Sequence, residues 1–392
     1  MRLKFLFTNF HSTNAGDAAI VRAMLAHFRP LGEITVHCSD PDFARMVLPG
    51  AEAEFRRHLW PMFAKAPGFM DALAAGFSFS STLASALAFR IFGLKPGAGG
   101  GALNDFIESD VVVSIGGGFI THDYGFIRPY CDFIVAKALG KRLVLYAQSV
   151  GPFRGAFNRL VSRAVLGLAD LIIVREGQSA RNLRGLGLGG VHTTADAAFS
   201  LPPVRKKKAK RMRVAFSPRV WTFQNRSHGA RYLSFMKSLA WKIRGEFGAD
   251  ILLVPTTPED VRFHESLLEG MPPRTEIIGN VLPPERIASE LAGADFIVSS
   301  RMHPIVLGSL SATPFFAVGW EYKLDELSSM LCGSPCSVHA SKADSATEEL
   351  ILMRIRERGA LRKQMLARLP EVRAEADRSS VLLKKSLKAW GY

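Results

Sequence analysis

Short, mostly apolar runs alternate along the chain with segments in which apolar residues recur every three or four positions. In the first half the clearest runs cover residues 3–7, 110–115, 142–147 and 171–174. Runs of this length without polar alternation are typical of strands buried on both faces of a parallel sheet. The segments between them have the spacing of amphipathic helices. The pattern therefore predicts an open, mostly parallel sheet covered by helices.

The same alternation restarts in the second half. Residues 201–203, Leu-Pro-Pro, precede a basic run at 205–213, and prolines followed by a solvated charge run are typical of a linker. We therefore expect an α/β protein with two Rossmann-like, doubly wound domains in a GT-B-like arrangement and a C-terminal helix that begins after a break at Pro370. The predicted boundaries are residues 1–203, a linker at 204–212, residues 213–370 and the helix at 371–392.

Polar side chains follow two apolar runs of the second half. Arg301 and His303 come directly after the run at 295–299, and Lys323 follows the run at 314–318. Two strands joined by a helix place their exit loops side by side at the carboxyl edge of the sheet. Arg301, His303 and Lys323 are therefore expected to face one crevice. Positive charge beside an imidazole suits an anionic ligand and proton transfer.

Loops of the first half carry a second group of candidates. Asn14 to Asp17 leads into a predicted helix, Gly16 allows a tight turn, and Asp17 stands where an N-cap is expected. A helix N-terminus of this kind binds anions or sugars in many proteins, although Asp17 could serve only as a cap. The glycines at 116–118 end a strand and permit close approach of a ligand, and Asp123 follows them.

Composition narrows the class of partner. The 392 residues suggest two domains, and 50 Lys and Arg against 35 Asp and Glu give a net charge of +15. This excess suits phosphorylated substrates, anionic lipid or nucleic acid, although a basic protein without a special partner shows it too. The basic run at 205–213 has no interleaved aromatic residues, so no nucleic-acid partner is expected.

Cysteine usage and hydropathy favour a cytoplasmic protein. The four cysteines are sparse and no histidines are paired at ligand spacing, so we expect reduced thiols and no metal site. The N-terminus has too short an apolar run for a signal peptide, and no stretch reaches the ~18–20 strongly apolar residues that span a bilayer. The segment at 60–101 has two interpretations: an interfacial patch at the inner face of the membrane, or packed helices. The absence of flanking cationic clusters favours packed helices.

Six short stretches, in order along nearly the whole chain, resemble motifs of the polysaccharide pyruvyl transferases. They are Asn14-Ala-Gly-Asp17 with Ala19-Ile20, Ser114-Ile-Gly-Gly-Gly118, Ala147-Gln-Ser-Val-Gly-Pro152, Asp170 to Glu176 with Ser179 and Leu183, Asp196 with Phe199, and Ser300-Arg-Met-His303 with Lys323. Each motif alone is weak, but six in order are specific. Two residues depart from the family pattern: Ala147 replaces a glycine, and Pro304 replaces a small apolar residue.

The resemblance implies a GT-B-like enzyme that transfers a pyruvyl group from phosphoenolpyruvate to a sugar of an exopolysaccharide or cell-wall glycan precursor. The acceptor, whether free or lipid-linked, receives a cyclic ketal and phosphate is released. His303 would act as general acid and base, and Arg219, Arg301 and Lys323 would bind the phosphate and carboxylate. No cofactor or metal is implied beyond phosphoenolpyruvate as donor. The acceptor-side candidates are Asn14, Asp17, Gly117, Gly118, Asp123 and Arg175.

Two other functions stay open on the sequence. A GT-B glycosyltransferase would use a nucleotide sugar, with Glu321 placed to bind the ribose. A non-catalytic, membrane-associated component of glycan assembly would use the basic run and the segment at 60–101. Several candidates also have purely structural alternatives, in which Arg301 pairs with Glu321, Lys323 with Asp325 or Glu326, and Arg175 with Glu176, while Asp196 anchors the domain interface.

Overall fold

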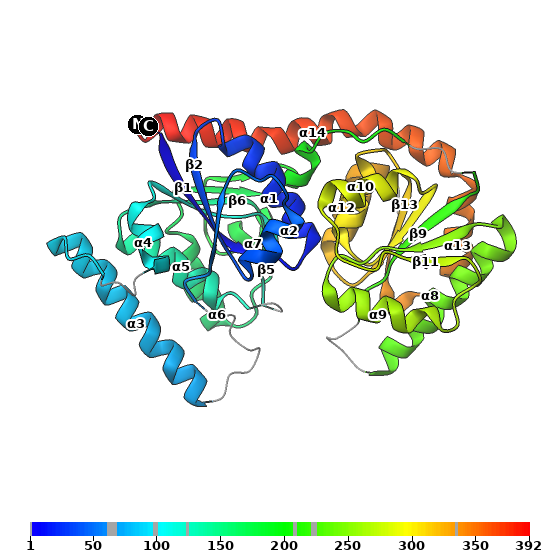
Figure 1. The fold of residues 1–392 in the computed structure, drawn as a ribbon, viewed down its shortest axis with the longest axis horizontal. Helices are drawn as coiled ribbons and strands as arrows, with labels where there is room; N and C mark the ends of the chain where they lie inside the picture. Colours follow the sequence, from blue (N-terminus) through cyan, green and yellow to red (C-terminus); the bar gives the residue numbers. More distant parts are fainter. Residues whose placement is uncertain are drawn as a thin grey trace. The chain divides into compact units, whose positions relative to one another are not determined.

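The computed structural model describes residues 2–60, 69–96, 101–122, 125–206, 210–220, 226–333 and 336–392 (Figure 1). The chain divides into two compact units. The first unit comprises residues 1–12, 20–197 and 375–392, and the second comprises residues 13–19 and 198–374. Each unit is built around one parallel sheet, as the alternating pattern predicts.

The sheet of the first unit has the strand order β3-β2-β1-β4-β6-β7-β8, with β5 paired to β6, and every pair is parallel. Its strands are β1 (Leu3–Phe10), β2 (Gly32–Cys38), β3 (Glu54–Arg57), β4 (Val111–Ser114), β5 (Gly117–Ile120), β6 (Arg142–Val150), β7 (Leu171–Val174) and β8 (Val191–Thr193). The strand order reverses direction at β1, because β2 and β4 both pair with it. Such switch points are where ligands bind in open α/β sheets.

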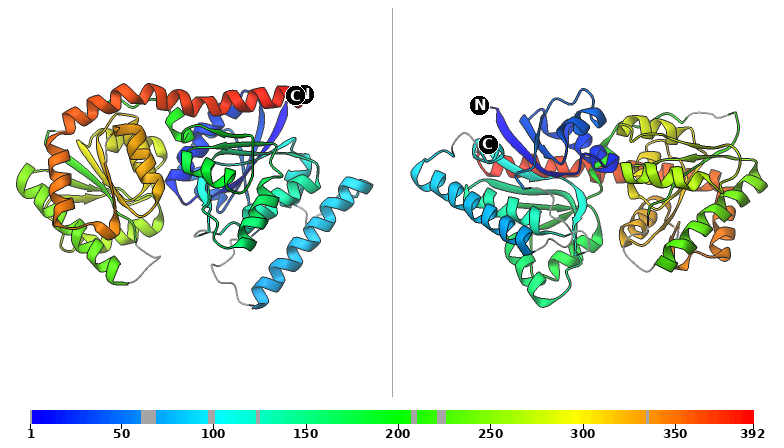
Figure 2. Two further views of the ribbon diagram at one scale, coloured as in Figure 1. Left: turned by 180° about the vertical axis from the view of Figure 1, so that it is seen from behind. Right: turned by 60° about the horizontal axis from the view of Figure 1, so that its bottom comes forward.

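Helices cover both faces of this sheet. They are α1 (Ala15–Phe28), α2 (Pro41–Val47), α3 (Phe69–Phe92), α4 (Gly101–Glu108), α5 (Ile127–Ala138), α6 (Ala156–Leu166) and α7 (Gly177–Arg184), followed by the 3₁₀ turn η1 (Ala197–Ser200). Phe28 of α1 packs edge-on against Phe5 and Phe7 of β1, with ring centroids 5.1 and 4.8 Å apart. These buried aromatic contacts fix α1 on the sheet, while α3, α5 and α6 lie on the opposite face (Figure 1 and Figure 2).

The sheet of the second unit has the order β11-β10-β9-β12-β13-β14 and is also parallel throughout. Its strands are β9 (Arg213–Ser217), β10 (Asp250–Leu253), β11 (Thr275–Ile277), β12 (Phe296–Ser299), β13 (Phe315–Gly319) and β14 (Ser337–His339). Its helices are α8 (Arg226–Phe247), α9 (Pro258–Leu268), α10 (Pro284–Ala292), α11 (Met302–Ser309), α12 (Tyr322–Cys332), the 3₁₀ turn η2 (Ala340–Lys342) and α13 (Ser345–Arg356).

The long helix α14 (Arg358–Ala389) corrects one prediction. The sequence suggested a break at Pro370, but the helix continues through that residue. A proline inside a helix removes one backbone hydrogen bond. Here buried apolar side chains recur at helical spacing on both sides of Pro370, and their packing maintains the helix. They are Leu361, Met365, Leu369, Val372 and Ala376.

The division into units also differs from the predicted boundaries. The sequence placed Asn14 to Asp17 with the first half, whereas residues 13–19 group with the second unit. The physical reason is a backbone contact, because the Ala15 amide donates to the Thr256 carbonyl at 2.9 Å. The start of the predicted linker likewise belongs to the second unit, since the Val204 amide donates to the Leu310 carbonyl at 2.9 Å.

Candidate functional site

Four neighbouring strands of the second unit end in loops that carry polar side chains. In spatial order the strands are β10, β9, β12 and β13. Arg219 follows β9, Arg301 and His303 follow β12, and Glu321 and Lys323 follow β13. The two strands that precede Arg301 and Lys323 are adjacent and parallel, as the βαβ interpretation of the sequence required. These loops therefore meet at one edge of the sheet.

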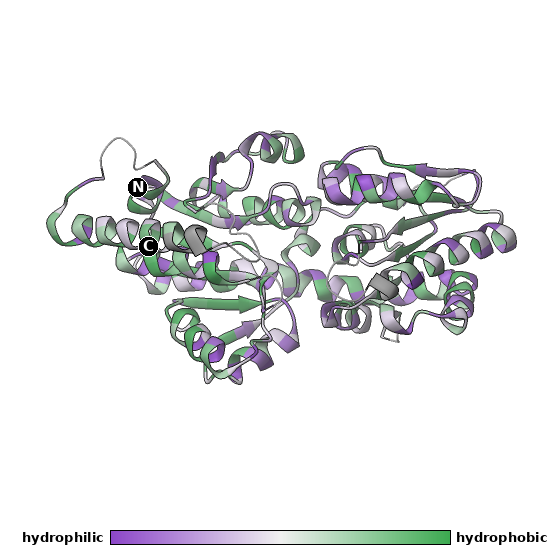
Figure 3. Cartoon of the chain, turned by 90° about the horizontal axis from the view of Figure 1, so that it is seen from below, coloured by the Kyte–Doolittle hydropathy of each residue, from purple (hydrophilic) through white to green (hydrophobic). Residues whose placement is uncertain are grey.

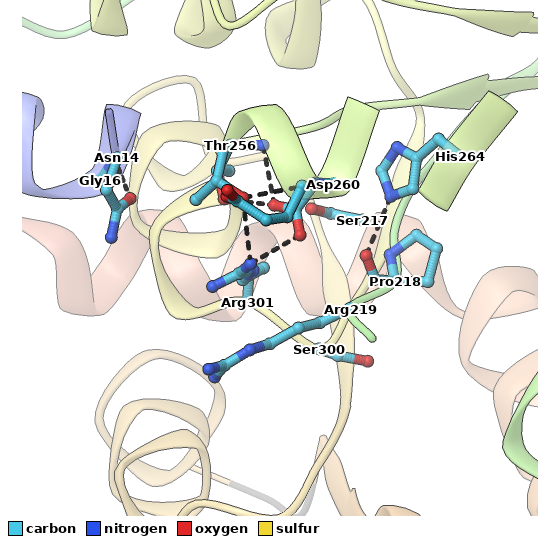
Figure 4. Close-up of polar contacts among 12 residues, drawn as sticks. Asn14, Gly16, Ser217, Pro218, Arg219, Thr256, Asp260, His264, Ser300 and Arg301 are labelled. Carbon is cyan, nitrogen blue, oxygen red and sulfur yellow. Dashed lines mark hydrogen bonds and ion pairs between the residues drawn. The ribbon is translucent and has the colours of Figure 1, made fainter. Parts of the chain in front are cut away.

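Arg301 is held by the loop after β10 (Figure 4). Its Nη2 atom lies 2.6 Å from Oδ1 of Asp260 and donates to Oγ1 of Thr257 at 3.4 Å. The Nε atom of Arg301 is buried and has no hydrogen-bond partner among the residues that the structure describes. The guanidinium is thus fixed on one side and keeps a donor for a further acceptor.

Asp260 is the residue that orients Arg301. Its side chain is 1% exposed, and Oδ2 accepts hydrogen bonds from the Thr256 amide and hydroxyl at 3.1 and 2.9 Å. Burial acts to raise the pKa of Asp260, but the charge of Arg301 and the hydrogen bonds from Arg301 and Thr256 outweigh burial, so the pKa lies below its ordinary value. Asp260 therefore stays ionised near neutral pH. Nothing in the sequence pattern pointed to it.

Glu321 bridges two of the predicted anion-binding residues. Its carboxylate lies 3.0 Å from Nζ of Lys323 and 3.7 Å from Nη1 of Arg219. The Arg219 guanidinium also lies over the ring of Trp320, 5.3 Å from its centroid. The structural alternatives expected Glu321 to pair with Arg301, but the partner of Arg301 is Asp260. Counting these groups, three cations face two carboxylates, so the edge keeps a net positive charge.

His303 packs directly against Gly16. A Cβ atom built on Gly16 would lie 2.3 Å from Nδ1 of His303 and 2.6 Å from its Cγ. His303 is the second residue of α11. Pro304 is tolerated at the next position, because the first amides of a helix have no hydrogen-bond partner within the helix. Gly16 is the second residue of α1. The two helix starts therefore meet at the imidazole, and only glycine leaves room for it.

The N-terminal loop caps its helix differently from the prediction. The helix α1 begins at Ala15, and Oδ1 of Asn14 accepts a hydrogen bond from the Gly16 amide at 2.9 Å (Figure 4). Asn14 is therefore the N-cap, and Asp17 lies in the first turn, where its charge suits the positive end of the helix dipole. Both were predicted on the acceptor side, but they belong to the unit that carries His303.

A buried tyrosine supports the same edge. The Tyr232 hydroxyl shares a hydrogen bond with the Ser300 hydroxyl and accepts one from the Arg219 amide at 3.3 Å. Burial raises the pKa of Tyr232 to about 12, so the hydroxyl stays protonated. Tyr232 thereby ties the loop after β9 to the loop after β12. The helical pattern of residues 231–247 gave no sign of this role.

In the first unit, Arg175 is part of a buried ion-pair network. Its Nη1 atom donates to Oδ2 of Asp196 at 2.5 Å, and its Nε atom donates to the Ser149 hydroxyl at 2.7 Å and to Oε2 of Glu176 at 3.3 Å. Arg175 is 2% exposed. The structural alternative, in which Arg175 forms a buried ion pair, therefore describes its environment better than binding of the acceptor sugar does. Asp196 is a member of the same ion-pair network.

Replacing Arg175 by methionine is expected to lower the free energy of unfolding by about 3–5 kcal/mol, because Glu176 and Asp196 would stay buried without their cation. Chemical denaturation measures the difference. The matched control is Arg378→Met, which removes a half-exposed ion pair with Glu375 and should change stability by about 0.5 kcal/mol or less. Equal effects of the two variants would contradict the assignment.

The glycines after β4 are required by the local packing and backbone conformation. A Cβ atom on Gly116 would lie 2.9 Å from the Ala147 carbonyl oxygen. Gly117 has a φ of 155° and begins β5 with Gly118, rather than forming a turn, and its carbonyl accepts a hydrogen bond from Nε2 of Gln148 at 2.6 Å. Ala147 itself has a φ of 50°, which explains why glycine suits this position of the motif.

One predicted acceptor residue, Asp123, lies outside the described residues. At the carboxyl end of β1 the structure shows a buried polar group that the sequence did not reveal. Arg128, at the start of α5, donates to Oδ1 of Asn9 at 3.4 Å, and its buried Nη1 atom has no partner within the described part of the chain. Burial and the charge of Arg128 lower the pKa of His11 to about 4, so this histidine is neutral. The group lies at the carboxyl edge of β1, where the strand order reverses.

Asp132 of α5, next to Arg128, is expected to make the stability of the folded protein depend on pH. Burial, opposed by the charge of Arg128, raises the pKa of Asp132 from 3.8 to about 7. Between about pH 4 and 7 the folded protein binds more protons than the unfolded chain, so stability falls as the pH rises through this window, by at most about 4 kcal/mol. Replacing Asp132 by asparagine should flatten this dependence and stabilise the protein at pH values above 7.

Urea denaturation at the two ends of the window tests this expectation. Asp42→Asn is the matched control, because its side chain is 93% exposed, and it should behave like the wild type. An Asp132→Asn variant with the wild-type pH dependence would show that Asp132 is not the group responsible.

No group of three or more His, Cys, Asp or Glu in the described ranges is arranged to hold a metal ion. All four cysteines are buried thiols that form no disulfide.

Comparison with known proteins gives one family and one fold. Residues 14–322 match the family model of the polysaccharide pyruvyl transferases. Similar solved structures include UDP-GlcNAc 2-epimerase from Neisseria meningitidis bound to UDP-GlcNAc (10% identity, TM-score 0.63, covering 99% of this chain and 100% of that one) and MurG from Acinetobacter baumannii (11%, 0.55, 98% and 100%). No curated protein matches. At this identity the likeness shows the fold alone, and it confirms the predicted α/β fold of GT-B type with two Rossmann-like domains.

Proposed function

Because the chain belongs to the polysaccharide pyruvyl transferase family, we propose that it transfers a pyruvyl group from phosphoenolpyruvate to a sugar of an exopolysaccharide or cell-wall glycan precursor. The products are a pyruvate ketal on two sugar hydroxyls and inorganic phosphate. The observation that carries the proposal is the edge of the second unit's sheet, where neighbouring strands β9, β12 and β13 are followed by Arg219, by Arg301 with His303, and by Lys323.

The chemistry of the donor fits these residues. Phosphoenolpyruvate carries a phosphate and a carboxylate, both of which guanidinium and ammonium groups bind by charge-assisted hydrogen bonds. Arg301 is fixed by Asp260 and keeps its buried Nε donor for an acceptor. Lys323 lies in the first turn of α12, and His303 in the first turn of α11, so backbone amides add positive potential at the same edge.

His303 is proposed to move the protons. A proton is added to the methylene carbon of the enol, which leaves positive charge at the neighbouring carbon. A first sugar hydroxyl attacks that carbon and loses its proton. Phosphate then leaves with the electrons of its C–O bond, which restores positive charge at the carbon, and the second hydroxyl attacks there and loses its proton. Of the two protons released, one balances the proton added to the methylene carbon and the other leaves with the phosphate. An imidazole can give the first proton and accept a later one. No cofactor is needed for this balance.

The charges of Arg219 and Lys323 serve binding in this scheme. Replacing either by alanine is expected to raise the KM for phosphoenolpyruvate about tenfold or more with a smaller change in kcat, because each charge binds the ground state as well as the transition state. Initial-rate kinetics measure both constants. Lys363→Ala removes an exposed cation elsewhere in the second unit and is the control. A fall in kcat alone would contradict the binding role.

The acceptor side is proposed to lie in the first unit. Arg128 and Asn9, at the carboxyl edge of β1, offer polar groups at the switch point of that sheet. Asn14 and Asp17 are instead assigned to the donor side, since they group with the second unit. We propose that the reaction takes place in the cytoplasm, where the four buried thiols stay reduced.

A GT-B glycosyltransferase is the competing function. It would need Glu321 to bind a ribose, but Glu321 lies 3.0 Å from Lys323 and close to Arg219. The deciding experiment incubates the enzyme with phosphoenolpyruvate and a pool of glycan precursors, and follows phosphate release and the mass of the sugar. Phosphate release with a pyruvyl mass gain supports the proposal. Consumption of nucleotide sugars with phosphoenolpyruvate left intact would overturn it.

A further inference from the structure

The helix α3 leaves most of its apolar surface uncovered. Its segment from Ala74 to Phe92 is apolar and long enough to cross a membrane by length and composition, yet only about 6% of it is buried. Phe77 is 78% exposed, Ile91 66% and Phe92 72%. Figure 3 shows α3 mostly in green and white, because no charged residue stands between Asp71 and Arg90. An exposed apolar surface of this size marks an interaction site.

The helix is nevertheless attached to the first unit along its inner side. Ala86 is fully buried, and the ring of Phe79 lies 5.7 Å from that of Trp60. At the C-terminal end, Nη1 of Arg90 donates to the carbonyls of Lys137 and Ala138, both at 3.2 Å. These contacts hold α3 along α5. The helix is therefore suited to lie on a surface rather than to cross a bilayer.

The hydroxyl groups on α3 are partly satisfied within the helix. Ser81 and Thr82 both donate to the Ser78 carbonyl, and Ser85 donates to the Ser81 carbonyl, at 2.8 to 3.0 Å. A serine or threonine that donates to its own helix exposes less polarity than its side chain suggests. The surface of α3 is thus more compatible with lipid than the count of serines implied.

A second helix extends the apolar surface and adds charge. Helix α6 packs on α5, as α3 does, and all three lie on the same side of the sheet (Figure 1 and Figure 2). Phe157 and Leu160 of α6 are 75% and 66% exposed. Around them stand exposed cations, namely Arg154, Arg159 and Arg163. Neither residues 72–104 nor residues 133–169 contain any Asp or Glu.

We propose that the outer face of α3 and α6 docks the first unit on an anionic phospholipid surface, with α3 lying in the interface. Apolar side chains enter the headgroup boundary while arginines contact the anionic headgroups. The sequence favoured packed helices because α3 has few flanking cations. The structure supplies them from α6 and the loop before it, which are distant from α3 in the chain. This inference does not depend on the reaction proposed above.

Vesicle co-sedimentation of the full chain tests the proposal. The wild type should bind vesicles of phosphatidylcholine mixed with phosphatidylglycerol, and bind pure phosphatidylcholine at least tenfold more weakly. The triple variant Phe77→Ser, Ile91→Ser, Phe92→Ser should lose at least tenfold in binding to the mixed vesicles. The control Leu366→Ser, Val381→Ser changes two exposed apolar residues of α14 and should bind as the wild type does.

A second variant protects the test against misfolding. Arg154→Gln with Arg163→Gln removes charge without touching α3, and it should weaken binding to the mixed vesicles while leaving the thermal melting temperature unchanged. Equal binding to neutral and anionic vesicles would overturn the proposal. Binding of the arginine variant to the mixed vesicles with wild-type affinity would also overturn it. A third contradicting result would be a wild type that does not bind vesicles but forms a dimer, and that becomes monomeric when the α3 substitutions are made.

Discussion

Replacing His303 by alanine is expected to lower kcat for pyruvyl transfer by at least about 10²-fold and to leave the fold intact. Proton transfer by a positioned side chain contributes roughly 10²–10⁴-fold to an enzymatic rate, and the imidazole of His303 can both give and take a proton. Phosphate release measured with saturating phosphoenolpyruvate gives kcat, and circular dichroism confirms folding.

The control for this variant is His339→Ala. His339 is exposed and caps only the short turn η2, so its loss should leave turnover unchanged. Wild-type turnover in His303→Ala would remove His303 from the mechanism and leave the binding assignments of the three cations standing.

Replacing Gly16 by alanine is expected to reduce kcat by about 10²-fold. The new methyl group would lie 2.3 Å from Nδ1 of His303, so the imidazole must move, and a displacement of about 1 Å at a reacting group can cost this much in rate. The helix itself should accept alanine, since alanine is favoured over glycine inside a helix by about 1 kcal/mol. Lost turnover in a protein that circular dichroism shows to be folded is therefore the expected result.

Gly245→Ala is the matched control for this prediction. Gly245 lies in α8, also in the second unit, and a Cβ atom there meets nothing within 4 Å. It should change neither kcat nor the KM for phosphoenolpyruvate. If Gly16→Ala turned over like the wild type, the contact between α1 and His303 would have no catalytic role, and the N-terminal motif would need another explanation.

The ends of the strands could be predicted from the sequence because each depends on a pattern within a few neighbouring residues. Buried parallel strands are recognisable as continuous apolar runs, and a helix between two of them implies that their exits share an edge. Arg301, His303 and Lys323 were found this way. Asp260 was not, although it lies 2.6 Å from Arg301, because the two meet only through the sheet order β10-β9-β12. No spacing along the chain encodes that order.

The sequence by itself determined the alternation of strands and helices, the two-part organisation and the residues at the ends of β12 and β13, since each depends on neighbours within a few positions. The tertiary structure decided which distant groups meet. It placed Gly16 against His303, moved Asn14 and Asp17 to the second unit, paired Glu321 with Lys323, and carried α14 through Pro370. These outcomes depend on packing between segments far apart in the chain, where local propensity is overridden by the contacts that bury side chains together.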